Sequence, residues 1–380
     1  MDESAVGCCL HRRRYFVKGG SVLNIAFYVS NHGFGHIMRN IPVIAYLLEH
    51  TDNKVVLVTA HKHTALAKQY LERDTSLTEE ELAGRFVSIE QDVDLGLIVK
   101  PGTLIVDEEA LQAEVSEYVG KFPQLIAVAK NLFRDYSIDR VVVDIVPWAL
   151  TAAKESGLLS YLMASFTWIE QYVEFLPEEL IAPFRRCFAD VDSVLLYDLV
   201  NEPTRNRYPY GTEVGFVARP FHEDKVREIK GQFGGRPIVF LSLGGSNSGL
   251  DFDIDVNLLP YTFISTEGMR LKGENVHFLP VNINNTQDYV AASDFCISKA
   301  GWSTISEMML AGKPMALLER PDVSEDRMSI EKLLSRNAAI QITVDDLKSM
   351  GNVLQVMKDT EWCCKKYKNG CVNIVKNIIA

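Results

Sequence analysis

The chain has 380 residues and a mass of 42.7 kDa; 47% of the residues are hydrophobic and 23% are charged, as in an ordinary globular protein of about two domains. Its 39 basic and 50 acidic side chains give a net charge of −11, which argues against nucleic-acid binding, and no apolar run approaches the roughly 18–20 residues of a membrane-spanning helix. Seven cysteines without a C-x-x-C motif, and no apolar signal region, predict reduced thiols and a cytoplasmic protein. We expect residues 1–21 to be a disordered leader.

From residue 24 onward, short apolar runs alternate with amphipathic stretches. Apolar side chains recur at helical spacing over residues 37–48, and a second helix is predicted at 64–72. Such alternation is typical of βαβ units with a parallel sheet, which predicts a Rossmann-like domain over residues 22–200. The strands predicted for this domain are residues 24–30, 55–59, 86–89, 140–143, 159–163 and 194–197.

Residues 201–236 interrupt this rhythm. They are rich in proline and glycine and show little periodicity, so they are predicted to be an interdomain linker. A second strand and helix series then predicts another Rossmann-like domain over residues 237–360, with strands at 237–243, 276–278, 295–297, 314–318 and 339–342. The expected fold class is therefore α/β, with two parallel-sheet domains facing a central cleft.

The strongest motif lies around residues 298–307. A predicted strand ends near Ser298, Gly301 permits a tight turn, and a helix is expected to begin at residue 303 or 304 and to end at Gly312. The start of a helix offers unpaired N–H groups and a positive dipole end, which suit a diphosphate. Lys299 would add a cation, Ser303 and Thr304 would add hydroxyl donors, and Glu307 could accept hydrogen bonds from ribose. Thr304 and Glu307 also fit a capping box, and the residues alone leave both alternatives open.

A second candidate region is the loop over residues 30–39. Gly33 and Gly35 would let the backbone approach a ligand, and His36 and Arg39 lie near the start of the following helix. It is not a dinucleotide fingerprint, because Met38 stands at the third glycine position. His32 and His36 could each be an ordinary loop histidine. Asp144, at the end of a predicted strand, could be a general base, could hold His36 in one tautomer, or could cap the next segment.

Other motifs have simpler alternatives. The glycine-rich residues 244–249 are followed by Leu250 and Asp251, so they do not form a kinase phosphate loop. Three Asp-x-Asp pairs, at 92–94, 190–192 and 253–255, are interpreted as exposed acidic turns, and no metal site is predicted. The aromatic residues 148, 166 and 168 could form a stacking wall for a sugar acceptor, although such residues more often belong to a core.

Residues 301–307 (G-W-S-T-I-S-E), followed by M-x-L-A-G-K-P, resemble the nucleotide-sugar motif of GT-B glycosyltransferases. The similarity is to the bacterial cell-wall N-acetylglucosaminyltransferases and to the plant UDP-glycosyltransferase box. The pattern of residues 32–36, 144–148 and 166–168 is closer still to the glycosyltransferase-like domain of plant L-arabinose kinases. The resemblance implies the GT-B fold and transfer of a sugar from a UDP-sugar, or another nucleoside-diphosphate sugar, to an acceptor hydroxyl. It further implies inversion and a tail over residues 361–380 that packs back on the first domain. A diphosphate held at a helix start with Lys299 needs no metal, so we predict that the reaction uses no metal and no other cofactor.

The same resemblance implies a set of site residues. His36 or Asp144 would be the catalytic base, the uracil would lie near residues 281–283, and the glycine-serine loop would close on the donor phosphates. The nucleotide-sugar-binding residues implied in this way are Gly33, Gly35, Arg39, Gly245, Ser246, Val281, Lys299, Gly301, Ser303, Thr304, Glu307, Asp326 and Arg327. Met328 and Ser329 replace two glutamines that contact the donor sugar in the cell-wall family, so the sugar stays open.

Two alternative functions keep the nucleotide site. Nucleotide-sugar hydrolases of the pseudaminic-acid pathway type share the G-x-G-H-x-x-R pattern of residues 33–39, and a binding module without turnover is the other alternative. The expected partners are the nucleotide-sugar donor and an unidentified acceptor, which could be a small molecule, a glycan or a lipid-linked sugar. The amphipathic residues 175–184 could contact a membrane surface, although a packed helix is the commoner outcome.

Overall fold

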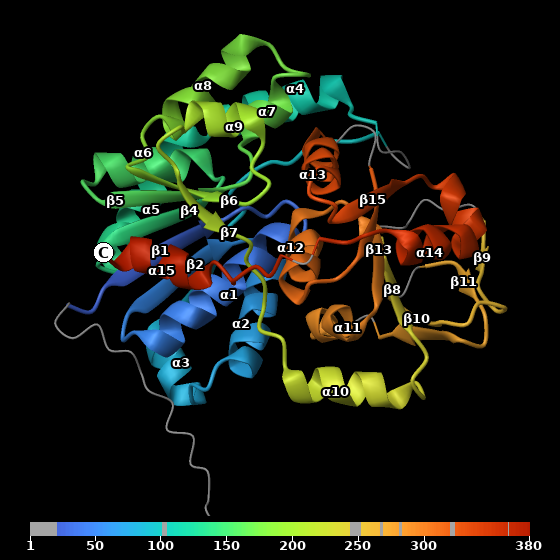
Figure 1. The fold of residues 1–380 in the computed structure, drawn as a ribbon. Coiled ribbons are helices and arrows are strands. Elements are labelled where there is room, and N and C mark those ends of the chain that lie inside the picture. The colour runs from blue at the N-terminus through green and yellow to red at the C-terminus, as the bar shows by residue number, and fades with distance from the viewer. Residues whose placement is uncertain are drawn as a thin grey trace, which may run out of the picture.

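The computed structural model describes residues 21–100, 105–243, 252–266, 269–280, 283–319, 324–363 and 365–380; the expected leader over residues 1–21 lies outside the described residues except for Ser21. Two parallel sheets, each with helices on both faces, lie side by side (Figure 1). The predicted class, α/β with two parallel-sheet domains, is confirmed. No helix among the described residues is both long enough and apolar enough to cross a membrane.

The first sheet has seven strands in the order β3-β2-β1-β4-β5-β6-β7, all parallel. Its central strands are nearly continuous runs of apolar side chains, because a parallel sheet is buried on both faces. The strands are β1 (Asn24–Val29), β2 (Lys54–Thr59), β3 (Phe86–Glu90), β4 (Arg140–Asp144), β5 (Leu159–Ala164), β6 (Ser193–Tyr197) and β7 (Thr212–Gly215).

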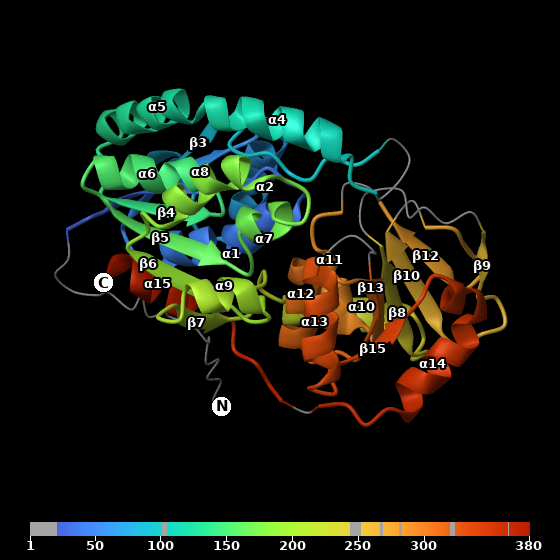
Figure 2. The ribbon, with the colours of Figure 1, turned by 90° about the horizontal axis from the view of Figure 1, so that it is seen from above.

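Helices cover this sheet in two layers, and alternate residues of β1 face each layer. Ile25 and Phe27 pack toward α1 (Gly35–His50), α2 (His61–Asp74) and α3 (Glu79–Arg85). Ala26 and Tyr28 pack toward the other layer (Figure 2). That layer consists of α4 (Glu108–Gly120), α5 (Phe122–Asp135), α6 (Pro147–Glu155), α7 (Trp168–Tyr172) and α8 (Glu178–Phe188). The amphipathic residues 175–184 thus lie partly in α8, which packs into this layer through Ile181 and Phe184.

The second sheet has six parallel strands in the order β12-β10-β8-β13-β14-β15. These are β12 (Val276–Leu279), β10 (Thr262–Thr266), β8 (Ile238–Ser242), β13 (Phe295–Lys299), β14 (Met315–Leu318) and β15 (Ala339–Ile342). One face carries α10 (Glu223–Gln232), α11 (Thr286–Ala292), α12 (Trp302–Ala311) and α13 (Ser324–Leu334). The other carries the 3-10 helix η1 (Asp345–Ser349), α14 (Met350–Asp359) and the short pair β9 (Ile254–Asp255) and β11 (Leu271–Lys272).

The structure differs from the expectation that residues 201–236 form a linker. Their first part contains α9 (Glu202–Arg207) and then β7, which is the edge strand of the first sheet. Their last part contains α10, which packs on α11 in the second domain. The chain therefore crosses from the first to the second domain only over residues 216–222, here called the first crossing. β7 was not predicted from the sequence because this edge strand, Thr-Glu-Val-Gly, needs no apolar run.

The chain returns to the first domain near its C-terminus. Residues 360–370, here called the strap, lead from α14 to α15 (Cys371–Ile379), which lies on α1 (Figure 1). Ile374, Val375 and Ile378 of α15 are buried there. The strap contacts the first crossing where the Gly370 N–H donates to the Phe216 carbonyl at 2.7 Å. A Cβ atom on Gly370 would lie 2.1 Å from the Val214 carbonyl oxygen, so this close approach requires glycine.

Candidate active site at the domain interface

Two helix N-termini meet between the domains. α1 follows β1 through Gly33, whose φ of +64° favours glycine, and α12 follows β13 through Gly301. Neither helix has a side-chain cap or an acidic residue in its first turn. The Ser303 hydroxyl at the start of α12 donates to the Gly35 carbonyl at the start of α1 (2.8 Å). Two uncapped positive dipole ends therefore face one region, which favours an anionic ligand there.

The capping-box alternative for Thr304 and Glu307 is not realised. α12 begins at Trp302 rather than at residue 303 or 304, and Gly301 occupies the N-cap position. Glu307 therefore lies in the second turn, and its carboxylate points to a partner outside the helix. Gly312 ends the helix in the left-handed conformation (φ +64°), as expected for a glycine at that position.

That partner is Arg219, from the first crossing. Its side chain is buried, and its Nε and Nη2 groups donate to Glu307 Oε1 at 3.1 and 2.7 Å. Burial by itself would lower the pKa of Arg219, but the charge of Glu307 outweighs it and raises this pKa. The two bonds fix the rotamer of Glu307. Among the described residues, no hydrogen bond reaches Glu307 Oε2.

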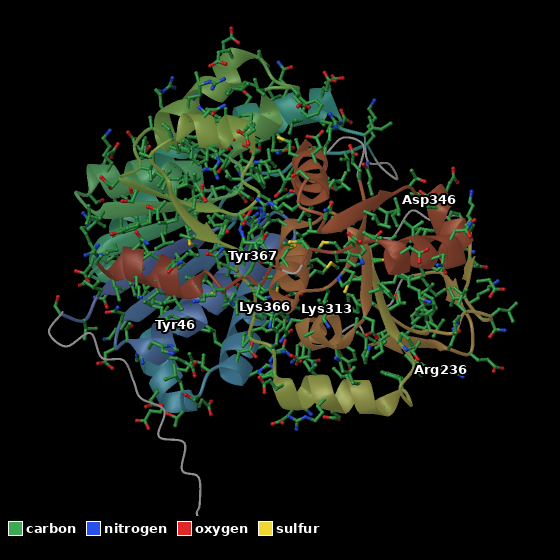
Figure 3. All side chains as sticks on the ribbon, in the orientation of Figure 1. Tyr46, Arg236, Lys313, Asp346, Lys366 and Tyr367 are labelled. Atoms are coloured by element: carbon green, nitrogen blue, oxygen red, sulfur yellow. The ribbon has the colours of Figure 1, made fainter. Side chains whose placement is uncertain are left out.

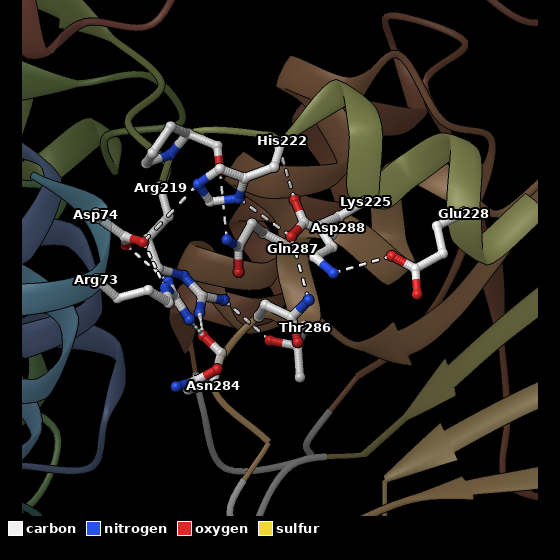
Figure 4. A network of polar contacts seen from close by, with 12 residues as sticks. Arg73, Asp74, Arg219, His222, Lys225, Glu228, Asn284, Thr286, Gln287 and Asp288 are labelled. Atoms are coloured by element: carbon white, nitrogen blue, oxygen red, sulfur yellow. Dashed lines mark hydrogen bonds and ion pairs between the residues drawn. The ribbon is translucent and has the colours of Figure 1, made fainter. Parts of the chain in front are cut away.

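Arg219 also joins both domains. Its Nη1 donates to the Tyr70 hydroxyl on α2 (2.9 Å) and to the Asn284 carbonyl (3.0 Å), and its Nη2 donates to Thr286 Oγ1 on α11 (2.9 Å). Figure 4 shows this network with Arg219, Asn284 and Thr286 together. The crossing is held again at His222, whose N–H donates to Asp288 Oδ1 (2.9 Å). The position of Glu307 therefore depends on contacts that span the interface.

On the first domain, Asp144 is the centre of a buried polar cluster at the carboxyl ends of β1 and β4. His36 Nδ1 lies 2.8 Å from Asp144 Oδ1. Arg39 donates from Nε to Oδ2 (2.7 Å) and from Nη2 to Oδ1 (2.5 Å). Asn40 Nδ2 donates to Oδ2 at 2.5 Å. Asp144 is only 1% exposed, so four bonds satisfy a carboxylate that water does not reach.

The contacts of this cluster bear on the three roles considered for Asp144. Burial alone would raise the pKa of Asp144, but the charges of Arg39 and His36 and their hydrogen bonds hold it well below its usual range. A carboxylate with such a pKa is a poor proton acceptor. Arg39 Nη2 also lies 2.9 Å from His36 Nδ1. In the tautomer that carries its proton on Nδ1, His36 donates to Asp144 and keeps its lone pair on Nε2. Asp144 does not cap α6, whose N-cap residue is Val146.

Arg39 is held by several contacts within the protein. It is buried, its Nη1 donates to Ser165 Oγ at 3.1 Å, and its guanidinium lies 4.9 Å from the Tyr197 ring and 5.6 Å from the Trp302 ring. Because Trp302 is the first residue of α12, Arg39 connects the His36 cluster directly to the opposing helix. The contact of Arg39 with the donor phosphates that the resemblance implies stays a prediction.

The other predicted binding residues lie in different surroundings. Lys299 ends β13, and Thr304 is half-buried in the first turn of α12. Asp326 is fully buried in α13, whereas Arg327 is exposed and its Nε lies 3.1 Å from Glu319 Oε1. Gly245, Ser246 and Val281 lie outside the described residues.

Asp94 is not part of an exposed acidic turn, in contrast to the expectation for the Asp-x-Asp pairs. It is buried and accepts hydrogen bonds from the Asn31 N–H and from Trp168 Nε1, both at 2.9 Å. Burial raises the pKa of Asp94 despite these bonds. The burial of Asp94 could not be predicted from the sequence, because its partners come from distant segments. Among the described residues, no group of three or more His, Cys, Asp or Glu side chains is arranged to hold a metal ion.

The aromatic residues considered as a stacking wall belong to the core. Trp148 is fully buried and its Nε1 donates to the Val93 carbonyl (2.8 Å). Phe166 and Trp168 are also buried, and their rings contact His36 and His32 edge-on, with centroids 5.8 and 5.4 Å apart. These rings support the loop that carries both histidines.

Three residues of the site escaped sequence reasoning. Asn40 had a usable signal, because His36, Arg39 and Asn40 at i, i+3 and i+4 share one helix face. Ser306 holds α12 to the first crossing, since its hydroxyl accepts from the Val217 N–H (2.9 Å) and donates to the Val217 carbonyl (2.7 Å). Arg219 lies in an aperiodic Pro-rich stretch, and only the fold brings it to Glu307.

Comparison with known proteins agrees with this architecture. Residues 260–358 match the Glycosyltransferase family 28 C-terminal domain. The crystal structure of the calicheamicin glycosyltransferase CalG4 superposes with a TM-score of 0.60 at 14% identity, covering 94% of this chain and 93% of that one. MurG of Acinetobacter baumannii gives a TM-score of 0.55 at 12% identity, covering 94% and 99%. The resemblance to GT-B glycosyltransferases is therefore confirmed for the fold.

Two relatives are similar in sequence. The L-arabinokinase of Arabidopsis thaliana is 24% identical over 319 residues, which cover 80% of this chain and 29% of the relative. The UDP-N-acetylglucosamine--N-acetylmuramyl-(pentapeptide) pyrophosphoryl-undecaprenol N-acetylglucosamine transferase of Parabacteroides distasonis is 36% identical over 87 residues, or 22% of this chain and 24% of the relative. The matches thus span less than a third of either relative's length.

Proposed function

We propose that this chain, whose architecture is that of the GT-B glycosyltransferases, transfers a sugar from a nucleoside-diphosphate sugar to an acceptor hydroxyl. UDP is the favoured nucleotide, because the Parabacteroides relative is named for a UDP-sugar donor. The observation that carries the proposal is the meeting of two uncapped helix N-termini, α1 and α12, between the domains. Such a site suits a diphosphate that must leave with added negative charge.

In the proposed complex, the diphosphate lies at the start of α12, near Lys299 and the hydroxyls of Ser303 and Thr304. The ribose hydroxyls donate to Glu307, whose carboxylate Arg219 holds in place. Backbone amides and a lysine supply the positive charge, so we propose that the reaction needs no metal and no other cofactor.

His36 is the proposed base. Asp144 holds its Nδ1, so Nε2 accepts the proton of the acceptor hydroxyl as that oxygen attacks the anomeric carbon. The bond from the anomeric carbon to the diphosphate oxygen breaks, and the configuration inverts because the attack is opposite the leaving group. Charge grows on the departing diphosphate, and loss of a single hydrogen-bond donor to such a charge typically costs about 2.7–4 kcal/mol of barrier.

A two-part experiment tests this proposal. Calorimetry with UDP, GDP, CDP and dTDP measures nucleotide binding, and release of nucleoside diphosphate from a donor panel measures turnover, with and without EDTA. The informative variant is His36→Asn, because the Asn amide can keep the bond to Asp144 but lacks a base at the Nε2 position. We expect UDP binding to persist and turnover to be lost. Failure of all four nucleotides to bind the folded protein would refute the donor site.

Two observations favour alternatives that the same assays separate. The His36 arrangement would activate water as readily as a sugar hydroxyl, which favours hydrolysis; rapid release of free sugar without an acceptor would support it. Asp326 and Ser329 are buried, although the cell-wall resemblance assigns this segment to the donor sugar. That burial favours a nucleotide-sugar-binding module, for which binding without turnover across the donor panel would be the expected result.

A further inference from the structure

A cavity lies behind α12, at the end of the helix opposite to the proposed donor site. It has a volume of about 500 Å³, which is within the range of small-molecule pockets. The last turn of α12 forms one side through Met309 and Leu310, and the strap forms the other through Trp362 and Tyr367. Figure 3 shows Tyr367, Lys366 and Lys313 on this face, where the strap passes α12. The walls are therefore largely apolar and partly aromatic.

The charge around this cavity is unusual for a protein with a net charge of −11. Lys313, Lys365 and Lys366 line it, and none of the described lining residues is Asp or Glu. Lys365 Nζ lies 4.6 Å over the Tyr367 ring. Neither Lys313 nor Lys366 has an ion pair among the described residues. Lys313 is half-buried, and burial together with Lys230 lowers its pKa, although the charge of Asp294 acts in the opposite direction.

The position of α12 explains only one of these cations. A lysine next to a helix C-terminus interacts favourably with the dipole, and Lys313 directly follows the terminal Gly312. Lys365 and Lys366 belong to the strap, which returns from the second domain, so the helix dipole gives no reason for a cluster. Three ammonium groups beside an apolar, aromatic recess form a site complementary to an anion with an apolar body.

We propose that this cavity binds an amphiphilic anion: a single phosphate or carboxylate near Lys313, Lys365 and Lys366, attached to an apolar chain or ring that packs between Trp362, Tyr367 and Leu310. The site is independent of the proposed transferase activity. The cavity lies between α12 and the strap, which is the second segment that crosses between the domains. A bound ligand would therefore link the strap to α12. The anion can come from a free metabolite or from a lipid headgroup, and the experiment distinguishes these sources.

The test uses the full chain with decyl phosphate below its micelle concentration, measured by calorimetry. Inorganic phosphate serves as the probe without an apolar body, and decyltrimethylammonium as the probe of opposite charge. The variant is Lys313→Met with Lys366→Met, and the matched control is Lys358→Met, an exposed lysine on α14 that is not part of the cavity. We expect decyl phosphate to bind the wild type and Lys358→Met equally, and the double variant roughly tenfold or more weakly.

Thermal unfolding of each variant without ligand checks that the fold is retained. A second variant, Leu310→Trp, fills the recess and should also abolish binding while keeping the lysines. Sedimentation with phosphatidylglycerol vesicles, if lost in the double variant, assigns the anion to a lipid headgroup; binding of decyl phosphate alone assigns it to a free amphiphile. Equal affinity of the folded double variant and the control, or equal binding of the cationic probe, overturns the proposal.

Discussion

The replacement Asp144→Asn tests the central cluster most directly. The carboxylate accepts hydrogen bonds from His36, Arg39 and Asn40 and is only 1% exposed. Asparagine keeps the shape but leaves the buried Arg39 cation without its counter-ion. Breaking one partner of a buried pair typically costs about 3–5 kcal/mol, a large part of a total stability of about 5–15 kcal/mol. Urea unfolding would measure this loss.

The turnover rate of the Asp144→Asn variant provides a second test. Without the carboxylate, His36 loses the partner that fixes its tautomer, so we expect turnover to fall by about 10²–10⁴-fold, the usual contribution of general base catalysis. The double variant Asp144→Asn with Arg39→Met removes both buried charges and should recover much of the stability but none of the turnover. Asp253→Asn, in an exposed ion pair with Arg270, is the surface control.

The pH dependence has a definite sign. The pKa of Asp144 is lowered in the folded state, so its contribution to stability is complete above the unfolded value of about 4 and is lost as the pH falls toward the folded value. Asp144→Asn should lose that part of the acid sensitivity. If its unfolding free energy matches that of Asp253→Asn, or if the double variant turns over normally, the roles assigned to Asp144 and His36 are incorrect.

Three further predictions follow from other contacts. Glu307→Ala and Arg219→Met should each weaken UDP binding roughly tenfold or more by calorimetry, because Arg219 orients the carboxylate of Glu307. The control Glu331→Ala, at an exposed position on α13, should leave UDP binding unchanged. Burial, then Lys62 and His36, lower the pKa of His63 to about 4, so the wild type should lose stability as the pH falls from about 6.5 to 4. His63→Leu should flatten this part of the plot of unfolding free energy against pH. An unchanged plot would contradict the prediction. Gly370→Ala should lower stability by about 1–3 kcal/mol because its Cβ meets the Val214 carbonyl, whereas Gly231→Ala, with open space in α10, should be neutral or slightly stabilising in thermal unfolding.

The fold was largely predictable because buried parallel strands appear in the sequence as short runs of apolar residues. β1, β2 and β4 are runs of apolar, mostly β-branched residues between amphipathic helices. β10 was missed although it is central, since Thr-Phe-Ile-Ser-Thr carries polar side chains, and two of these, Ser265 and Thr266, are hydrogen-bonded within the sheet. β7 was missed because an edge strand needs little hydrophobicity.

The site was predictable only where its chemistry is local. Gly301, Ser303 and His36 follow strands directly, so their place at the carboxyl edges of the sheets could be inferred. The partner of Glu307 could not, because Arg219 is 88 residues away and is brought in by the crossing. In the same way, the low pKa of Asp144 depends on Arg39 and His36, and sequence reasoning could not choose between base and orienting group.

The location of α15 has a consequence for how the chain matures. Ile374, Val375 and Ile378 cover apolar surface of α1, the first helix of the amino-terminal domain, yet they are synthesised only after both sheets. During translation the amino-terminal sheet can form early, but an apolar surface on its first helix stays uncovered until α15 has been synthesised. Premature termination before residue 371 should therefore yield a product that aggregates.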